Sequence, residues 1–321
     1  MKAIVQDHYG TSDQLVLTDV PDPVPGPGEV LVRVAAAGVD RGTCHVMTGL
    51  PLVARLGLGL RRPKDRIPGR DVAGTVVSLG QGVTTYAIGD AVFGTARGSF
   101  AELAVLPPTR MARCPSTVAL EEAAAVPVSG LTALQALRAA KVTSGDRVLV
   151  IGASGGVGSF AVQLAVHLGA EVTGVCGPAK ADLVRSLGAH RVVDHTTTPL
   201  ETLGEQFDAV IDIAGHRPVG LLRRLLTERG ALVVVGSEGG GRWLGGLERS
   251  IGAALLSPFV KQKLVMLVAS ENGSDLADLT EVIERGGLRP ALERTFPLNE
   301  AGAAVDHVAS GRARGKVVVT P

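Results

Sequence analysis

A glycine-rich segment in the middle of the chain has the spacing of a phosphate-binding loop. Ala153, Gly155 and Gly158 match the pattern G-x-G-x-x-G with alanine in the first place. They follow the apolar run Arg147–Ile151 and precede an apolar stretch with helical character. In that context, backbone N–H groups at the start of a helix can approach a pyrophosphate, which a Cβ atom would block. We therefore predict a dinucleotide-binding loop; the alternative is an ordinary glycine turn.

The end of the next predicted strand distinguishes the two nicotinamide cofactors. Proteins that bind NAD carry an acidic residue about 20 residues after the glycine motif, where it bonds the ribose hydroxyls. Here the strand Glu171–Cys176 is followed by Gly177, and the nearest carboxylate, Asp182, lies inside the following helix. Lys180 could neutralise a 2′-phosphate, or it could be a solvated lysine at a helix start. The missing acid favours NADPH.

The sequence contains few residues with the spacing of a metal site or of a catalytic nucleophile. Cys44 and His45 are adjacent, the other histidines lack ligand spacing, and no C-x-x-C occurs. Gly152-Ala153-Ser154-Gly155-Gly156 has the spacing G-x-S-x-G of a hydrolase elbow, but Ser154 belongs to the predicted phosphate loop, so a hydrolase has no support. We predict that the chain binds no metal. Its three cysteines cannot build a disulfide framework, which favours a reducing cytoplasm.

The elements that position the glycine loop follow from strand and helix patterns. Strand-like and helix-like segments alternate after residue 146, which indicates βαβ units and a parallel sheet. Residues 1–110 read as short strands of a small β-barrel or sandwich, and residues 290–321 return to β-like pieces. The last of these, Gly315–Thr320, could complete the first domain. The predicted strands are 30–35, 72–79, 89–94, 99–105, 147–151, 171–176, 191–194, 209–213 and 231–235; the predicted helices are 120–140 (broken at Pro127), 156–168, 180–187 and 219–226.

Composition limits the possible partners. A length of 321 residues favours two domains, and 45% hydrophobic with 20% charged residues excludes general disorder. The net charge of +1 and the scarcity of aromatic residues argue against nucleic acid, and no apolar run is long enough to span a membrane. We expect a cytoplasmic protein with a small-molecule substrate.

The order of short motifs along the chain resembles the medium-chain dehydrogenase/reductase superfamily, specifically its zinc-independent quinone oxidoreductase branch. The resemblance covers nearly the whole chain. The motifs that carry it are Met1–Val5, Pro25–Val32, Ala36–Asp40, Pro68–Val76, Gly89–Gly94, Gly98–Glu102, Pro127–Ala133, Gly152–Gly158, Leu187–Ala189 and Gly311–Val319.

The resemblance implies an α/β fold with a GroES-like β-rich catalytic domain and a Rossmann-type, doubly wound parallel-sheet domain. We expect the first over residues 1–118 and 285–321 and the second over 119–284, with the active site in the cleft between them and a homodimer formed at the sheet edge of the nucleotide domain. Gly177 and Lys180 should face the adenosine phosphate, Thr132 and Gly236 the nicotinamide end, and Phe259 and Lys316 should close the cleft. The expected loop residues at the pyrophosphate are Ser154, Gly155, Gly156, Val157 and Gly158.

The zinc-free assignment rests on positions where the zinc-dependent relatives carry ligands. This chain has Asp40 in place of a cysteine, Gly69-Arg70-Asp71 in place of Gly-His-Glu, and Val128 near the third ligand position. The structural-zinc lobe with its four cysteines is also absent. The resemblance therefore implies a family member that works without zinc.

The expected reaction is hydride transfer from NADPH to a quinone or to the β-carbon of an α,β-unsaturated carbonyl, whose conjugation delocalises the developing charge. Asp40 and His45 are the candidate proton donors, each with a structural hydrogen bond as the alternative. Tyr86, the only tyrosine after Asp40, falls in a surface-like turn. The segment 49–68 could be a lid or a solvated basic loop. The rival functions are a zinc-free NADP-dependent alcohol dehydrogenase or carbonyl reductase, and a cofactor-gated binding protein like zeta-crystallin.

Overall fold

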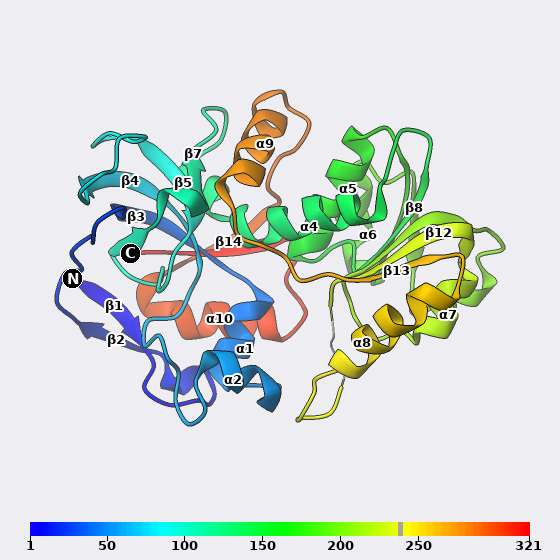
Figure 1. Cartoon of the computed structure of the whole chain (residues 1–321), viewed down its shortest axis with the longest axis horizontal. Helices are drawn as coiled ribbons and strands as arrows, with labels where there is room; N and C mark the ends of the chain where they lie inside the picture. Colours follow the sequence, from blue (N-terminus) through cyan, green and yellow to red (C-terminus); the bar gives the residue numbers. More distant parts are fainter. Residues whose placement is uncertain (237–239) are drawn as a thin grey trace. The chain divides into compact units, whose positions relative to one another are not determined.

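The computed structural model describes residues 1–236 and 240–321. The chain forms two compact units, which are drawn in Figure 1. The first unit contains Met1–Leu131 and Glu271–Pro321, so both ends of the chain belong to it, and the second contains Thr132–Ser270. The second unit is therefore an insertion in the sequence of the first.

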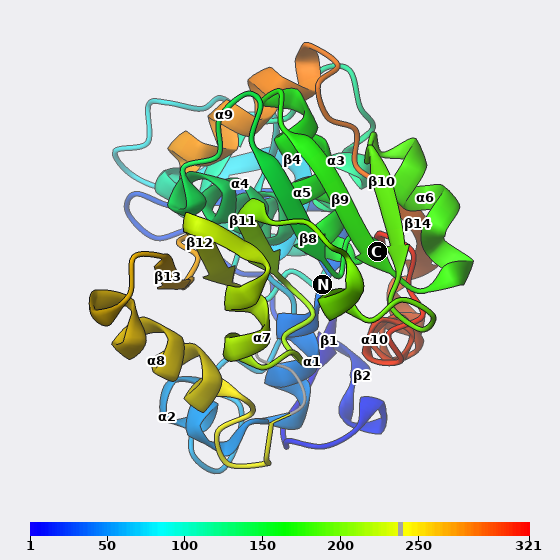
Figure 2. The same cartoon turned by 90° about the vertical axis from the view of Figure 1, so that its right-hand side faces the viewer.

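The second unit is a doubly wound parallel sheet. Its strands are β8 (Arg147–Ile151), β9 (Glu171–Cys176), β10 (Arg191–Asp194), β11 (Phe207–Asp212), β12 (Leu226–Val234) and β13 (Lys263–Met266). In the described chain they lie in the order β10-β9-β8-β11-β12-β13, and every pairing is parallel. Figure 2 shows this sheet with β8 and β11 at its centre. The predicted Rossmann-type sheet is confirmed.

Helices connect the strands of this sheet. They are α5 (Gly156–His167), α6 (Ala181–Ser186), α7 (Val219–Arg224) and α8 (Leu247–Leu256), with short 3-10 turns at Pro178–Lys180, Leu200–Thr202 and Ser257–Phe259. The connections run outward in opposite directions from β8 and from β11, so right-handed crossovers place the two helix pairs on opposite faces. Figure 1 shows α7 and α8 below β12 and β13. Because both faces are covered, β8 is a continuous apolar run whose residues Val148–Ile151 are all buried.

The first unit is built around a mainly antiparallel sheet. Its strands are β1 (Lys2–Val5), β2 (Val16–Asp19), β3 (Val30–Val39), β4 (Asp71–Leu79), β5 (Ala91–Thr95), β6 (Leu103–Leu106), β7 (Met111–Arg113), β14 (Leu292–Pro297) and β15 (Lys316–Thr320). Where the structure describes it, the sheet order is β14-β15-β3-β4-β5-β7, with β6 also paired to β3 and with β1 and β2 forming a separate hairpin. The predicted strand at 315–320 does complete this unit, since β15 pairs antiparallel with β3.

The remaining elements of the first unit are helical. They are α1 (Arg41–Thr48), α2 (Arg55–Leu58), α3 (Leu120–Ala124), α9 (Gly273–Glu284) and α10 (Ala301–Ala309), with 3-10 turns at Ser12–Gln14, Leu52–Ala54, Pro108–Arg110 and Leu298–Glu300. Helix α4 (Pro127–Ala140) begins in the first unit and ends in the second. The β-like interpretation of residues 290–321 was wrong for α10, which packs against α1 and β15.

The two units change over at different residues from those predicted. The predicted boundaries lay after residue 118 and before residue 285, whereas the structure places them after Leu131 and before Glu271. The reason is packing: α3 lies against β3, β4 and β5, and α9 lies against β7. Both helices therefore belong to the first unit.

Candidate functional site

The glycine loop joins β8 to α5 at the carboxyl edge of the parallel sheet. Gly152 has a φ of 87°, and its N–H and that of Ala153 donate to the Val175 carbonyl oxygen at 3.1 and 3.0 Å. The Gly155 N–H donates to the Gly152 oxygen at 3.1 Å, and the helix begins at Gly156 without a side-chain cap. This turn directs the first N–H groups of a 12-residue helix out of the sheet edge, an arrangement that favours an anion.

Two glycines of the loop differ in what a side chain would meet. A Cβ atom on Gly158 would lie 2.1 Å from the Gly152 oxygen and 2.8 Å from Ala153 backbone atoms, so close helix–strand packing requires glycine there. A Cβ atom on Gly155 would meet only the Gly152 oxygen, at 3.5 Å. The side of the loop at Gly155 therefore has room for a ligand, and the backbone cradle fits a pyrophosphate.

The loop lies where the strand order reverses: from β8 the chain continues to β9 and β10, and from β11 it continues the other way to β12 and β13. β8 and β11 are neighbours, and the N–H groups of Ile213 and Ala214, which follow β11, donate to the Ile151 oxygen at 3.0 and 3.2 Å. Ligands of doubly wound sheets bind in this crevice. A larger cavity of about 630 Å³ is lined by Arg147, the first residue of β8, so it lies at the opposite edge of the sheet.

The residues that follow β9 are those predicted to bind the adenosine end of a dinucleotide. Gly177 precedes the 3-10 turn, and Lys180, half-buried, precedes α6. Burial raises the pKa of the Cys176 thiol, Asp194 raises it further, and the nearby Lys180 charge lowers it. Lys180 thus follows the carboxyl end of β9 along the chain, and its role at a 2′-phosphate stays a prediction. Asp182 points into an ion pair with Arg185 at 2.7 Å.

Asp194, at the end of β10, is a carboxylate beside β9 that sequence reasoning did not weigh. It lies opposite Cys176 in the strand register. Its Oδ1 accepts the Thr196 N–H at 2.9 Å and the Thr196 hydroxyl at 2.7 Å, and these bonds lower the pKa of Asp194. This carboxylate is thus engaged in a local turn.

A buried ion pair braces the loops after β11 and β12. Asp212 is fully buried, and its Oδ2 accepts a hydrogen bond from Arg249 Nη1 at 2.7 Å. Arg249 also donates to the carbonyl oxygens of Arg217 at 2.7 Å and Gly236 at 3.0 Å, while the Gly215 N–H donates to Asp212 Oδ1 at 3.2 Å. Burial raises the pKa of Asp212, and Arg249 opposes this rise. Sequence reasoning missed this pair, which holds Gly236 in place.

The other residues expected at the nicotinamide end lie as follows. Thr132 and Ser154 are buried, and Gly236 must be glycine because a Cβ atom there would lie 2.0 Å from the Ile213 oxygen. Phe259, expected to close the cleft, lies in a 3-10 turn with 83% of its surface exposed. Its ring therefore faces solvent in this chain.

Lys316 lies inside the first unit, which differs from its predicted place over the cofactor. It is 1% exposed, and its Nζ donates to Asp71 Oδ2 at 3.2 Å and to Ser129 Oγ at 3.0 Å. The Val128 N–H donates to Asp71 Oδ1 at 2.8 Å. Burial raises the pKa of Asp71, and Lys316 is the main group that opposes this. The ammonium is thus the counter-ion of a buried carboxylate.

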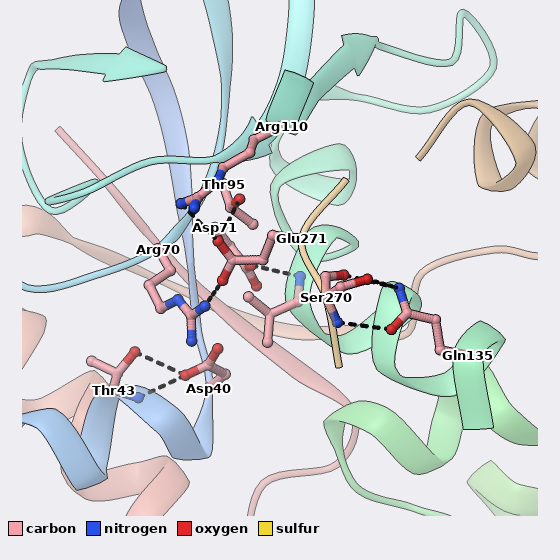
Figure 3. Close-up of polar contacts among 10 residues, drawn as sticks. Asp40, Thr43, Arg70, Asp71, Thr95, Arg110, Gln135, Ser270 and Glu271 are labelled. Atoms are coloured by element: carbon pink, nitrogen blue, oxygen red, sulfur yellow. Dashed lines mark hydrogen bonds and ion pairs between the residues drawn. The ribbon is translucent and has the colours of Figure 1, made fainter. Parts of the chain in front are cut away.

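The two candidate proton donors have structural partners. Asp40 caps α1: its Oδ1 accepts the Thr43 N–H at 2.7 Å and the Thr43 hydroxyl at 3.0 Å, as Figure 3 shows. His45 lies on the same helix, and its Nδ1 is 2.9 Å from the Leu50 carbonyl oxygen, which makes Nδ1 the protonated nitrogen. Tyr86, half-buried, donates to the Met111 oxygen at 3.0 Å. The catalytic roles of Asp40 and His45 stay predictions.

Arg70 stands beside a cavity of the first unit. The cavity has a volume of about 390 Å³, and residues 57–70 and 96–98 supply much of its lining together with Thr43 and Val46 of α1. Glu271 forms an ion pair with Arg70, and its Oε2 also lies 3.3 Å from Arg110 and accepts a hydrogen bond from Thr95 at 3.0 Å (Figure 3). The basic segment 49–68 is therefore part of a cavity wall.

The described residues contain neither a cluster of metal ligands nor a membrane-spanning helix. Within 1–236 and 240–321, no three His, Cys, Asp or Glu side chains gather as ligands of one metal ion would. No helix in that part of the chain has the length and apolarity needed to cross a membrane.

Comparison with known proteins gives matches over the full chain. Residues 26–116 match the alcohol dehydrogenase GroES-like domain, and residues 187–319 match a family described as zinc-binding dehydrogenase. The chloroplast envelope quinone oxidoreductase homolog of Arabidopsis thaliana is 31% identical, covering 100% of this chain and 98% of its own. The 2-methylene-furan-3-one reductase of Solanum lycopersicum is 30% identical, covering 100% and 79%.

A solved structure of a mycobacterial protein complexed with NADPH is 28% identical, with a TM-score of 0.83 and full coverage of both chains. The sequence matches, the fold and the glycine loop at the centre of the parallel sheet thus all indicate the same family. The chain is an oxidoreductase that belongs to the medium-chain dehydrogenase/reductase superfamily, in its quinone oxidoreductase branch.

Proposed function

We propose that the chain is a zinc-independent, NADPH-dependent oxidoreductase that reduces a quinone or an α,β-unsaturated carbonyl. The main support comes from the carboxyl edge of the parallel sheet. There the glycine loop leads into the N-terminus of α5, and a lysine, not a carboxylate, follows β9. The names of the Arabidopsis and tomato relatives, a quinone oxidoreductase homolog and a methylene-furanone reductase, support both acceptor classes.

Each end of the cofactor has its own binding residues in this proposal. The N–H groups from Gly155 to Gly158 bind the pyrophosphate, and Lys180 with Gly177 binds the 2′-phosphate. Thr132 and Gly236 lie along the nicotinamide ribose, and the pair Asp212–Arg249 keeps the Gly236 carbonyl oriented through the 3.0 Å bond from Arg249. When bound, NADPH supplies the hydride. The NADPH complex of the mycobacterial relative supports this choice of cofactor.

The residues at the three ligand positions of the zinc-dependent relatives support zinc independence. Asp40 caps a helix, Arg70 pairs with Glu271, and Val128 uses its N–H to hold Asp71. A guanidinium and an aliphatic side chain do not bind Zn²⁺. A conjugated acceptor also spreads the charge that zinc would otherwise stabilise. Activity unchanged by a chelator, and no stoichiometric zinc by metal analysis, are the expected results.

An NADPH oxidation assay tests the reaction. The purified chain is offered 1,4-benzoquinone, an enone, a simple aldehyde or no acceptor, and we expect turnover with the first two only. Turnover with the aldehyde alone would favour a carbonyl reductase. Tight NADPH binding with no acceptor reduced would overturn the proposal in favour of a binding protein.

The variant Lys180→Glu tests the choice of cofactor. Loss of a hydrogen bond between a lysine and a phosphate costs about 1.5 kcal/mol, so the KM for NADPH should rise about tenfold or more, while that for NADH changes less. The matched control is Lys141→Glu, which makes the same charge change at an exposed position directly after α4. Equal losses for the two cofactors would remove the phosphate assignment.

We also propose a homodimer through the α8–β13 side of the second unit. Large apolar side chains in residues 243–268 are exposed there, which is typical of a covered interface. They are Trp243, Leu244, Ile251, Leu255, Phe259 and Val268. A dimer by analytical ultracentrifugation that dissociates in a Leu255→Asp/Phe259→Asp variant is expected; a monomeric wild-type chain would contradict it. A cytoplasmic location stays a prediction.

A further inference from the structure

The cavity of the first unit combines apolar walls with a surplus of positive charge. Val46, Leu58, Ile67 and Pro68 supply apolar surface, and the volume of about 390 Å³ is that of a small-molecule site. Its charged lining consists of four cations and two anions: Lys64, Arg70, Arg97, Arg110, Asp65 and Glu271. The whole chain carries a net charge of only +1, so this excess is a local feature.

Glu271 cannot neutralise both of the guanidinium groups that it contacts. One of its oxygens pairs with Arg70, and the other is shared between Arg110 at 3.3 Å and the buried Thr95 hydroxyl at 3.0 Å. Glu271 is 14% exposed, whereas the side chains of Arg70 and Arg110 are 47% and 41% exposed. The carboxylate thus holds two guanidinium groups at the cavity wall and leaves one positive charge in excess there.

Lys64 and Arg97 add to this excess from two exposed loop segments, and only Asp65 opposes them. A cavity with low-dielectric walls and one sign of charge concentrates ligands of the opposite sign. Guanidinium groups also match the two oxygens of a carboxylate. The lining therefore suits a molecule with an apolar body and an anionic group.

We propose that this cavity binds the electron acceptor and selects conjugated carbonyl compounds that carry a carboxylate. The apolar residues contact the conjugated part, and the carboxylate lies among Arg97, Lys64 and the Arg70–Arg110 pair. This inference rests on the proposed reductase function and narrows its substrate class. It requires no additional co-reactant, because the carboxylate binds and is not itself transformed.

A matched pair of acceptors separates charge from reactivity. 3-Benzoylacrylate and its methyl ester share one conjugated ketone, and the ester is the more electron-poor and hence the more reactive towards hydride. We expect kcat/KM with NADPH to be about tenfold higher for the acid at low salt, and the preference to shrink as salt rises. Equal values, or a preference for the ester at all salt concentrations, would overturn the proposal.

Variants locate the effect in the cavity. Arg97→Ala and Lys64→Ala should each lower kcat/KM for the acid about three- to tenfold more than kcat/KM for the ester. Glu271→Gln retains the side-chain shape, removes a negative charge, and should raise the preference for the acid by a similar factor. The control Arg229→Ala removes an exposed cation from β12 of the second unit. If Arg229→Ala changes the preference as much as Arg97→Ala, the cavity is not the cause.

Equilibrium binding keeps this proposal separate from the reductase function. If neither compound is reduced, the reductase function fails, and calorimetric titration still decides the cavity assignment. The acid should bind more tightly than the ester, and Arg97→Ala should weaken binding of the acid more than binding of the ester. Equal affinities of the wild-type chain for both compounds would refute the anion-selective cavity.

Discussion

Replacing Lys316 by methionine leaves a buried carboxylate without its counter-ion, and the resulting loss of stability should depend on pH. The Lys316 Nζ lies 3.2 Å from Asp71 Oδ2, and both side chains are buried. Burial raises the pKa of Asp71, while Lys316 and the Val128 N–H lower it. Lys316→Met retains the apolar length of the side chain and removes the charge. The pKa of Asp71 therefore rises further, and the carboxyl group takes up a proton when the variant folds.

The magnitude follows from this protonation. Breaking a buried ion pair costs about 3–5 kcal/mol. Because the carboxyl group can bind a proton, the cost is limited to about 1.36 kcal/mol for each pH unit above the ordinary pKa of 3.8. That limit is about 4 kcal/mol at pH 7 and about 1.6 kcal/mol at pH 5. The folded variant binds more protons than its unfolded state above pH 3.8, so its stability falls as pH rises.

Urea unfolding followed by far-ultraviolet circular dichroism at pH 5, 6 and 7 measures this. Because burial raises the pKa of Asp71 in the wild-type chain as well, we expect the destabilisation by Lys316→Met to grow by at most about 3 kcal/mol between pH 5 and pH 7. The double variant Asp71→Asn/Lys316→Met should recover more than half of the loss at pH 7, with little pH dependence, since the amide oxygen still accepts the Val128 N–H. A loss of equal size at all three pH values would show that packing, and not the uncompensated carboxylate, is the cause.

Three further predictions concern Gly158, Arg249 and Cys114. Gly158→Ala should destabilise the chain by about 2 kcal/mol or more, because the new Cβ atom would lie 2.1 Å from a carbonyl oxygen, whereas Gly155→Ala, with a 3.5 Å contact, should not; equal shifts of the thermal midpoint would contradict this. Arg249→Met should lower the free energy of unfolding in urea by about 3–5 kcal/mol, and adding Asp212→Asn should restore part of this loss. If the second substitution restores none of the loss, the Asp212–Arg249 ion pair does not stabilise these loops. The Cys114 thiol, with its pKa raised by burial to about 12, should resist a thiol reagent at pH 8 until the chain is unfolded, so rapid labelling of the native protein would count against this assignment.

The nucleotide-binding unit could be predicted well from the sequence because its signals are local. The strands at 147–151, 171–176 and 191–194 agree with β8, β9 and β10 in both bounds. β8 and β9 are almost wholly buried in a sheet covered on both faces, so burial and sequence pattern coincide there, whereas β10 lies at the sheet edge and buries only Val193. The glycine loop was predictable for the same reason, since its geometry depends on seven consecutive residues, 152–158.

The site in the first unit depends on contacts between distant residues, and these could not be predicted. Arg70 and Glu271 come from opposite ends of the chain and meet only because the chain returns to the first unit after Ser270. Asp40 offered a local signal, because aspartate is a preferred N-cap residue at the start of a helix. Helix α10 contains Gly302 and β-branched residues, which weakened its helical pattern, and its packing against α1 stabilises it.

Because the second unit is inserted in the first, the two parts of the first unit are synthesised at different times. Asp71 and Lys316 are 245 residues apart, and a ribosome adds about 5–20 residues each second, so Asp71 leaves the ribosome roughly 12–50 s before its counter-ion. During that interval β3 lacks its neighbour β15, while the whole of the second unit becomes available to fold. The nascent chain therefore holds an open strand edge beside a carboxylate that stays hydrated until the last strand arrives.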